Sequence, residues 1–193
     1  MASPAPTPAR RQLAGRQADT AGALVDAAVV EIAETGFEGL TLRNVARRAG
    51  VSPATAYSYF SSKNHLLAEV FWRRLSALEP PPVDRRRSVS ERVGETVRGM
   101  ALLVADEPEL AAGITTAMLA HDADVKLLRD RIGALFVDRL ARALGRDATP
   151  TLVRALTLTF TGAMLTAGMG NLRYDDLPAL LVDAAELMTG RKR

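Results

Sequence analysis

The 193-residue sequence predicts an all-α protein with a small N-terminal helical unit and a larger C-terminal helical unit. Three observations support this prediction. Apolar residues recur at helical spacing along most of the chain, Pro and Gly stand where helices should begin and end, and no convincing β-strand pattern occurs. Hydrophobic residues make up 48% of the chain but aromatic residues only 5%, a composition that suggests aliphatic helix packing.

Residues 41–63 give the clearest local prediction. Thr41 is a good N-cap for a first short helix, whose apolar residues recur at helical spacing. Gly50 supplies the left-handed residue that ends this helix. Ser52 caps a second helix, Pro53 to Tyr59, which has Pro at its first position, where the missing N–H costs nothing. Two short helices joined by a tight turn with Gly form a helix-turn-helix, which docks in the major groove of DNA.

A longer ordered set of residues surrounds this motif, namely Phe37-Glu38-Gly39-Leu40-Thr41, Val45-Ala46, Ala49-Gly50-Val51-Ser52, Thr55, Tyr57, Tyr59-Phe60 and Ser62-Lys63. This set resembles the N-terminal signature of the TetR family of bacterial, dimeric, ligand-responsive transcriptional repressors. The resemblance covers the first third of the chain. It departs from the family pattern at Ala56, which is smaller than the usual branched residue, and at Asn64-His65, which replaces an acidic pair. The resemblance implies a three-helix DNA-binding domain followed by a domain for ligand binding and dimerisation.

The predicted DNA contacts lie on the motif and comprise Thr41, Arg43, Ser52, Pro53, Ala54, Thr55, Tyr57, Tyr59 and Lys63. Arg43 can pair with a phosphate or a guanine edge, and Thr41 stands at a helix N-terminus suited to a phosphate. The leading end of the second helix should face base edges, where the methyl groups of Ala54 and Thr55 suit thymine. In the resembling family, residues matching Tyr57, Tyr59 and Lys63 commonly contact phosphates. Alternatively, the ring of Tyr57 lies partly in the core.

The segment before the motif divides into an arm and a helix. Residues 1–18 are expected to form a flexible basic arm, with arginines that either remain solvated or reach DNA phosphates and the minor groove. These arginines are Arg10, Arg11 and Arg16. A helix is expected from about Thr20 to Thr35, ended by Gly36, and the DNA-binding domain with its connecting helix should occupy residues 19–79.

A change of composition marks the expected domain boundary. A helix that starts at Ser61 or Ser62 must stop before the run of prolines at 80–82. The following Asp84-Arg85-Arg86-Arg87 is expected to be a solvated linker, with phosphate binding as the less favoured alternative. The C-terminal helical domain for ligand binding and dimerisation is expected over residues 85–193.

Capping residues predict the C-terminal helices one by one. Ser88 and Glu91 fit a capping box for a helix to about Ala105, Pro108 opens the next helix, and a long helix should run from Ala123 to Leu144. Thr149-Pro150 starts another helix, and a last one should begin near Asp176 and end at Gly190.

The stretch from Ala155 to Leu172 contains no charged side chain. A membrane-spanning helix is one explanation, but the many Thr and Gly residues make the stretch only mildly hydrophobic. A helix that is apolar all round is instead buried on more than one side, with one face on the core and another on a second subunit. The sequence therefore predicts a homodimer and no membrane contact. The family resemblance implies that the last two helices form the interface.

A small-molecule effector is expected among the C-terminal helices. The candidate ligand-binding residues are Trp72, Met100, Leu103, Met118, Phe136, Leu140 and Phe160, each with plain core packing as its alternative. Few polar residues fall on these apolar stripes, which favours a hydrophobic effector. The predicted function is a repressor that binds a palindromic operator as a homodimer and is released by this effector. A helical adaptor, or a co-repressor-dependent regulator without effector-induced release, is the alternative.

Enzymatic function is not supported by the residues present. Cysteine is absent, the only histidines are His65 and His121, and no Gly-rich phosphate loop follows a strand. Residues 121–124 offer acids and a histidine for a metal, but helix capping by the acids is the simpler explanation. The sequence predicts neither cofactor nor metal. The first residues lack the apolar core of a signal peptide, which fits a cytoplasmic protein.

Overall fold

The computed structural model describes the backbone of residues 8–190 and the side chains of residues 16–190. No strand occurs among residues 8–190, so the predicted all-α class is confirmed. The helices, in chain order, are α1 (Pro8–Gly39), α2 (Leu42–Arg48), α3 (Pro53–Tyr59), α4 (Lys63–Ala77), α5 (Val89–Ala101), α6 (Pro108–Met118), α7 (Ala123–Leu144), α8 (Pro150–Gly168) and α9 (Leu177–Thr189). Short 3-10 turns extend the chain after α5 (Leu102–Val104), after α7 (Gly145–Asp147) and before α9 (Tyr174–Asp176).

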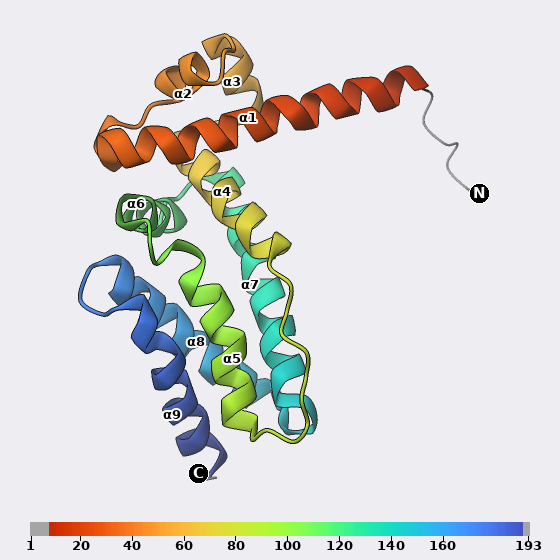
Figure 1. Cartoon of the computed structure of the whole chain (residues 1–193), viewed down its shortest axis with the longest axis vertical. Helices are drawn as coiled ribbons and strands as arrows, with labels where there is room; N and C mark the ends of the chain where they lie inside the picture. The colour runs from red at the N-terminus through yellow and green to blue at the C-terminus, as the bar shows by residue number, and fades with distance from the viewer. Residues whose placement is uncertain (1–7, 191–193) are drawn as a thin grey trace.

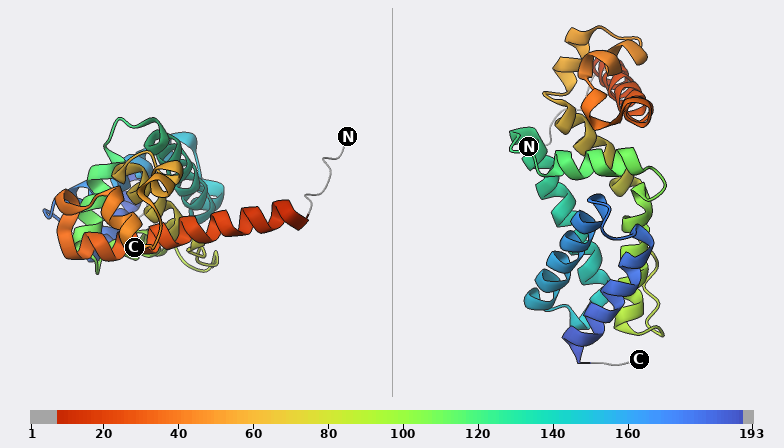
Figure 2. Two further views of the ribbon diagram at one scale, coloured as in Figure 1. Left: turned by 90° about the horizontal axis from the view of Figure 1, so that it is seen from above. Right: turned by 90° about the vertical axis from the view of Figure 1, so that its left-hand side faces the viewer.

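The helices form two regions joined by α4. Helices α1 to α3 lie at one end of the molecule, with α1 running across it, and α5 to α9 form a bundle below (Figure 1). The view from above shows that α1 projects well beyond the bundle at its N-terminal end (Figure 2). This arrangement places α2 and α3 on the outside of the molecule, away from the bundle.

Helix starts agree closely with the capping residues seen in the sequence. At the starts of most helices, the side chain of the N-cap residue accepts a hydrogen bond from a backbone N–H of the first turn. These N-cap residues are Thr41, Ser52, Ser62, Ser88, Asp122 and Thr149. The capping box is complete, since the Ser88 N–H donates to Glu91 Oε2 at 2.8 Å and the Glu91 N–H to Ser88 Oγ at 3.2 Å. Each such bond satisfies an N–H that the helix itself leaves unpaired.

The first helix starts earlier than the sequence predicts. It begins at Pro8 rather than near Thr20, so residues 8–18 of the expected flexible arm are helical, and residues 1–7 lie outside the described residues. The intervening Ala, Arg, Gln and Leu residues are strong helix formers, and Pro8 suits a first helical position. The expected end is correct in substance. Gly36, with φ of 66°, interrupts the helical backbone before a last short turn.

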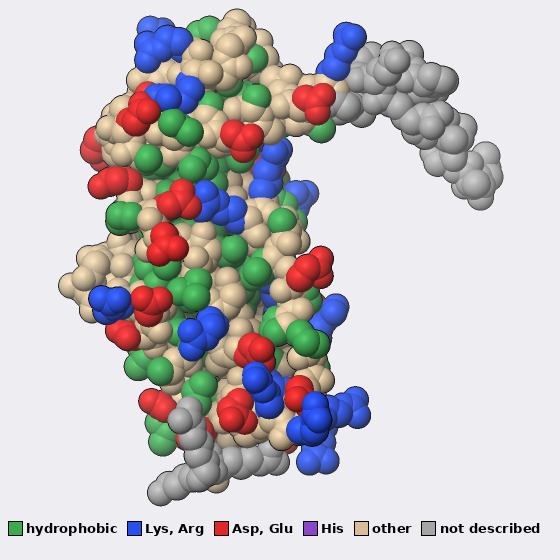
Figure 3. All heavy atoms as spheres, in the orientation of Figure 1, with side chains coloured by type: hydrophobic (Ala, Val, Ile, Leu, Met, Phe, Trp, Pro, Cys, Tyr) green, Lys and Arg blue, Asp and Glu red, His purple; other side chains and the backbone are tan. Residues whose placement is uncertain are grey.

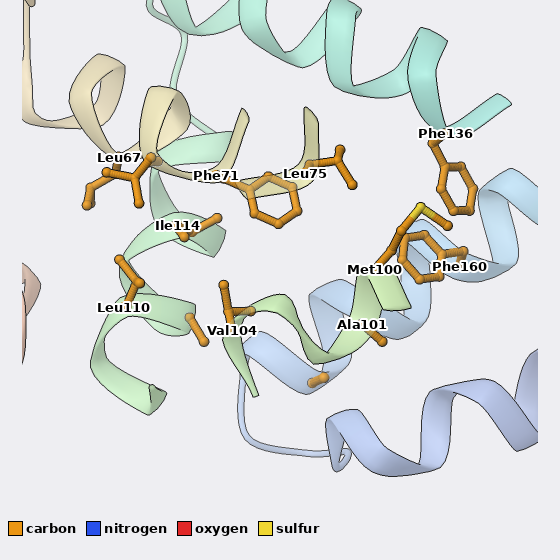
Figure 4. Packing of buried hydrophobic residues seen from close by; sticks show 14 of the residues in the cluster. Leu67, Phe71, Leu75, Met100, Ala101, Val104, Leu110, Ile114, Phe136 and Phe160 are labelled. Atoms are coloured by element: carbon orange, nitrogen blue, oxygen red, sulfur yellow. The ribbon is translucent and has the colours of Figure 1, made fainter. Parts of the chain in front are cut away.

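One hydrophobic core connects the two regions. Buried residues form a continuous cluster that includes members of every helix from α1 to α9. Figure 4 shows the central part, where Leu67 and Phe71 of α4 face Leu110 and Ile114 of α6. Helix α4 therefore belongs equally to the N-terminal helices and to the bundle. The expected domain boundary lies at the proline run, residues 80–82, but the hydrophobic core is continuous between the helices on either side of it.

Polar contacts fix the end of α4 on the bundle. The side chain of Arg139 in α7 is only 6% exposed, and its Nη2 donates to the carbonyls of Leu75, at 2.9 Å, and Leu78. These are carbonyls that the end of a helix leaves without partners. Burial lowers the pKa of the Arg139 guanidinium because desolvation disfavours its charge. Arg74 adds a second anchor, since it donates to the Leu103 carbonyl at 3.0 Å and pairs with Glu107.

Helices α5 and α9 pack at unusually short range. A Cβ atom added to Gly94 in α5 would lie 2.4 Å from Cγ2 of Val182 in α9 and 3.4 Å from the Pro178 carbonyl oxygen. Only glycine fits this position without a shift of the Val182 side chain or of one of the helices. By contrast, a Cβ on Gly133 in α7 would meet no atom within 4 Å.

We expect Gly94→Leu to lower the free energy of unfolding by roughly 1–3 kcal/mol, because the added side chain forces α5 and α9 apart. The control Gly133→Ala should raise it by roughly 0.5–1 kcal/mol, because alanine loses less backbone entropy in a helix. Urea unfolding of both variants at one protein concentration measures the difference. An equal effect of the two substitutions would contradict the packing described.

Candidate DNA-binding surface and its joint to the bundle

The predicted helix-turn-helix is present with the expected bounds. Helix α2 has Thr41 as its N-cap, whose Oγ1 accepts from the Asn44 N–H at 3.2 Å. Gly50 adopts a φ of 69°, and this left-handed turn allows α3 to start three residues later, at Pro53. Ser52 caps α3 by accepting from the Thr55 N–H at 3.0 Å. The motif is therefore built by local hydrogen bonds that the sequence specifies.

Helix α3 has one face in the core and one face in solvent. Ala56 is fully buried, and Phe60 directly after the helix is also buried. The predicted DNA-contacting residues Thr41, Arg43, Ser52, Pro53, Ala54 and Tyr57 are exposed, and Thr55, Tyr59 and Lys63 are half-buried. The ring of Tyr57 is 58% exposed, whereas Tyr59 packs against the core. The tyrosine that contributes to packing is thus Tyr59, and the alternative position of Tyr57 in the core is wrong.

An ion pair fixes α2 on α1. Glu31 of α1 is buried and accepts from Nε of Arg48 at 2.8 Å, and Glu34 pairs with the same guanidinium. Hydrogen bonds from Glu31 and Glu34 raise the pKa of Arg48 above its ordinary value. A buried carboxylate needs such a partner, because an unpaired charge in the core is strongly destabilising. The Arg48 guanidinium therefore holds the motif on α1, although the residue is exposed, as are Arg43 and Arg47 on the same helix.

Lys63 has a structural role that sequence reasoning missed. Its ammonium donates to the Phe37 carbonyl at 2.8 Å and lies 4.0 Å from the centroid of the Phe37 ring. These contacts tie the start of α4 to the segment after the Gly36 break. An ammonium has three N–H donors, so the bond to Phe37 leaves donors that could face a phosphate.

A polar joint connects the start of α4 with the start of α7. The Ser61 hydroxyl donates to Asp124 Oδ2 at 2.6 Å, and the Ser62 hydroxyl donates to Asp122. His65 Nδ1 lies 3.7 Å from Asp124 Oδ2, and its ring packs edge-on against Phe60 with centroids 5.3 Å apart. Because α3 ends at Tyr59 and Ser61 belongs to this joint, the end of α3 is linked to the bundle across a single residue, Phe60.

The sequence predicts that the acids of this joint cap a helix, with metal binding as the alternative. Asp122 caps α7 by accepting from the Asp124 N–H at 3.1 Å, so the capping prediction is confirmed. Within residues 8–190, no group of three or more His, Asp or Glu side chains is arranged to hold a metal ion. The hydrogen bond from Ser62 lowers the pKa of the Asp122 carboxyl.

The residues predicted to bind an effector do not share one site. Met100, Phe136, Leu140 and Phe160 are buried inside the bundle, where the rings of Phe136 and Phe160 stack with centroids 4.3 Å apart (Figure 4). Trp72 packs instead against a separate small cluster between α4 and α7, and Met118 packs against both that cluster and the main core. Leu103 lies half-buried in the turn after α5. Only the bundle group could line a common interior cavity.

The fold and the exposed second helix of the motif define a class of protein, the helix-turn-helix DNA-binding regulators of transcription. The family model described as "Bacterial regulatory proteins, tetR family" matches residues 24–70, which cover the second half of α1 and all of the motif. An uncharacterized HTH-type transcriptional regulator of Mycobacterium tuberculosis (strain ATCC 25618 / H37Rv) is 43% identical over 164 residues, 84% of this chain and 76% of that protein. The chain belongs to the TetR family and is a transcriptional regulator.

More distant relatives share parts of the sequence or the fold. The HTH-type transcriptional repressor KstR of Rhodococcus jostii (strain RHA1) is 30% identical over 136 residues, 66% of this chain and 60% of KstR. The crystal structure of a TetR transcriptional regulator from Rhodococcus sp. RHA1 has a TM-score of 0.74 at 19% identity, over 93% of this chain and 99% of that chain. The regulator FadR from Bacillus subtilis, in complex with stearoyl-CoA, has a TM-score of 0.61 at 22% identity, over 89% and 98%.

We expect the Ser62–Asp122 bond to contribute to stability above the ordinary carboxyl pKa of about 3.9 and to lose this contribution as the pH falls below it. The sign follows from the lowered pKa of folded Asp122, because the unfolded chain takes up the proton first. Asp122→Asn should therefore make the thermal midpoint fall less steeply on acidification. The control Asp130→Asn removes an exposed carboxylate that pairs with Lys126. Equal acid sensitivity of the Asp122 variant and the wild type would contradict this role.

Proposed function

We propose that the protein is a homodimeric repressor that reads a palindromic operator and is released by a small hydrophobic effector. The exposed face of α3, held on a motif fixed by its own caps and by the Arg48–Glu31 pair, is the observation that carries this proposal. The DNA-binding domain would comprise residues 19–79, and residues 85–193 would provide the effector site and the dimer interface.

Direct contacts to DNA are assigned to the exposed part of the motif. Arg43 and Tyr57 are fully available to a ligand, and the N-terminus of α3 presents Ser52, Pro53 and Ala54. A single short helix reads too few bases for tight specific binding, so two half-sites are needed. Lys63 would contact a phosphate only with the donors that Phe37 leaves unused.

The dimer is assigned to α8 and α9. Each helix buries one face in the bundle but leaves large apolar side chains in solvent, including Leu158 of α8 at 67% exposure and Leu187 of α9 at 85%. Gly162 is also exposed, so another helix could approach α8 closely there. No helix among residues 8–190 combines the length and hydropathy that crossing a bilayer requires. These exposed apolar residues suit a second copy of the chain.

The effector is assigned to the bundle interior around Met100, Leu140 and the Phe136–Phe160 stack. These side chains are apolar, which supports a hydrophobic ligand. The similarly folded FadR was crystallised with stearoyl-CoA, a molecule with a long apolar chain. Because the rings are in contact, binding would require α7 and α8 to move apart. A ligand that favours this wider bundle would shift the equilibrium away from the DNA-bound form.

Footprinting on the protein's own promoter region tests the proposal. We expect a protected palindrome, with the logarithm of affinity falling by about 0.9 per phosphate contact for each tenfold rise in salt. Arg43→Ala should weaken binding by roughly 1–3 kcal/mol, whereas the exposed control Arg98→Ala on α5 should not.

The same footprint reports release by an effector. Loss of protection on addition of long-chain acyl compounds would support the hydrophobic site, and a charged, highly polar effector would overturn it. A folded dimer that protects no DNA at low salt would instead favour an adaptor or a co-repressor-dependent regulator.

We expect Leu158→Glu to shift the protein from dimer to monomer in sedimentation experiments, because a carboxylate would be buried without a partner at the interface. Leu127→Glu is the matched control, since Leu127 is 61% exposed on α7, outside the proposed interface. Both variants should fold, because neither side chain is in the core. A dimer that survives Leu158→Glu with unchanged affinity would place the interface elsewhere.

A further inference from the structure

A second candidate binding site lies at the end of the molecule opposite to α3. The connection between α4 and α5 runs along α7 and turns back at its far end (Figure 1). Between this connection and the end of α7 lies a groove of about 820 Å³. Arginines from three segments line it, namely Arg85, Arg87, Arg92, Arg142 and Arg146. Lys and Arg side chains also gather visibly at this corner of the surface (Figure 3).

The arginine groove, as we call it, has more positive charge than its acidic neighbours neutralise. Arg87 pairs with Glu95, and Arg142 pairs with Asp138 at 2.9 Å. Asp147 also lines the groove and already has a partner. Among residues 16–190, five guanidiniums therefore face three carboxylates, those of Glu95, Asp138 and Asp147. Arg92 donates only to backbone carbonyls, those of Ala143 at 2.8 Å and Arg87 at 2.7 Å, and the side chains of Arg85 and Arg146 make no hydrogen bond or ion pair there.

The Arg92 bonds show that the groove is partly preorganised. Two carbonyls fix its guanidinium at the wall of the groove, so little side-chain entropy is lost when an anion binds. A smaller adjoining cavity of about 100 Å³ shares Arg92 and Arg142 and extends to the buried Arg139. The arginines therefore continue from the surface into the interior, with Glu95 beside them in this cavity.

The expected solvated linker describes only part of the arginine run. The side chain of Arg86 is 92% exposed and pairs with Asp84 two residues away, as a linker residue would. Arg85 and Arg87 on either side of it line the groove instead. Arg86 therefore faces solvent, whereas Arg85 and Arg87 face a common cavity. Arg86 provides a matched control within the same segment.

The size and chemistry of the groove indicate its ligand. Cavities of about 300–1,000 Å³ are typical of small-molecule sites. Guanidinium groups bind phosphate oxygens in pairs, and several converging guanidiniums favour a ligand with several negative charges. Operator DNA held by α3 would lie at the other end of the protomer (Figure 1). We propose that the arginine groove binds a small molecule with two or more phosphate groups.

Titration calorimetry of the full-length protein, without DNA, tests this proposal. The probes are inorganic triphosphate and ATP, with orthophosphate and sulfate at matched ionic strength. We expect saturable binding of triphosphate at one site per protomer, tighter than that of either single anion. The double variant Arg85→Gln/Arg146→Gln should weaken triphosphate binding by roughly tenfold or more, because it removes two charge-assisted contacts.

The control Arg86→Gln should bind triphosphate like the wild type. Tighter binding of ATP than of triphosphate would support an organic phosphate, and equal binding a free polyphosphate. The proposal is overturned if no probe saturates, if sulfate binds as tightly as triphosphate, or if Arg86→Gln weakens binding as much as the double variant. Loss of operator affinity in the double variant without any phosphate probe would also overturn it, by identifying the groove as a DNA contact. Because calorimetry needs no operator, failure of the proposed repressor function would leave its result unchanged.

Discussion

The structure depends on the burial of α4 between two sets of helices. Leu67 and Phe71 contribute to a core that contains α1 on one side and α6 on the other, so neither region has a complete core of its own. Burial of such side chains contributes about 1.5–3 kcal/mol each, far more than the surface polar contacts around them. The position of α3 is consequently set by the same packing that stabilises the bundle.

Polar contacts hold α4 at both ends, so this helix has little freedom to move on its own. At its start, Ser61 and Ser62 bond to the acids that open α7. At its end, Arg139 of α7 binds its last carbonyls. Because both anchors belong to α7, a displacement of α7 within the bundle must move α4 or break these bonds. This gives the proposed effector a physical route to the DNA-binding surface.

Local structure could be predicted from the sequence wherever one residue determines it. Ser52 with Pro53, and Gly50 before them, specify α3 to the residue, because caps and left-handed turns act through adjacent backbone groups. Contacts between distant segments could not be predicted in this way. Ser62 and Asp122 are 60 residues apart, and nothing local indicates that they meet. The arginine groove could not be predicted either. Its arginines come from the α4–α5 connection, from α5 and from the end of α7, which only the fold brings together.

The shared core also limits how regulators of this kind can be recombined. A chimera that joins the first sixty residues of one regulator to the bundle of another would replace Ile32 and Phe37, which lie against Gly113 of α6, with a foreign apolar surface. Under the proposed function, specificity for an operator would instead be exchanged by altering the exposed residues of α3, such as Ala54 and Tyr57. Exchange of α1 to α3 as a unit would have to include α4 and the residues that pack against it.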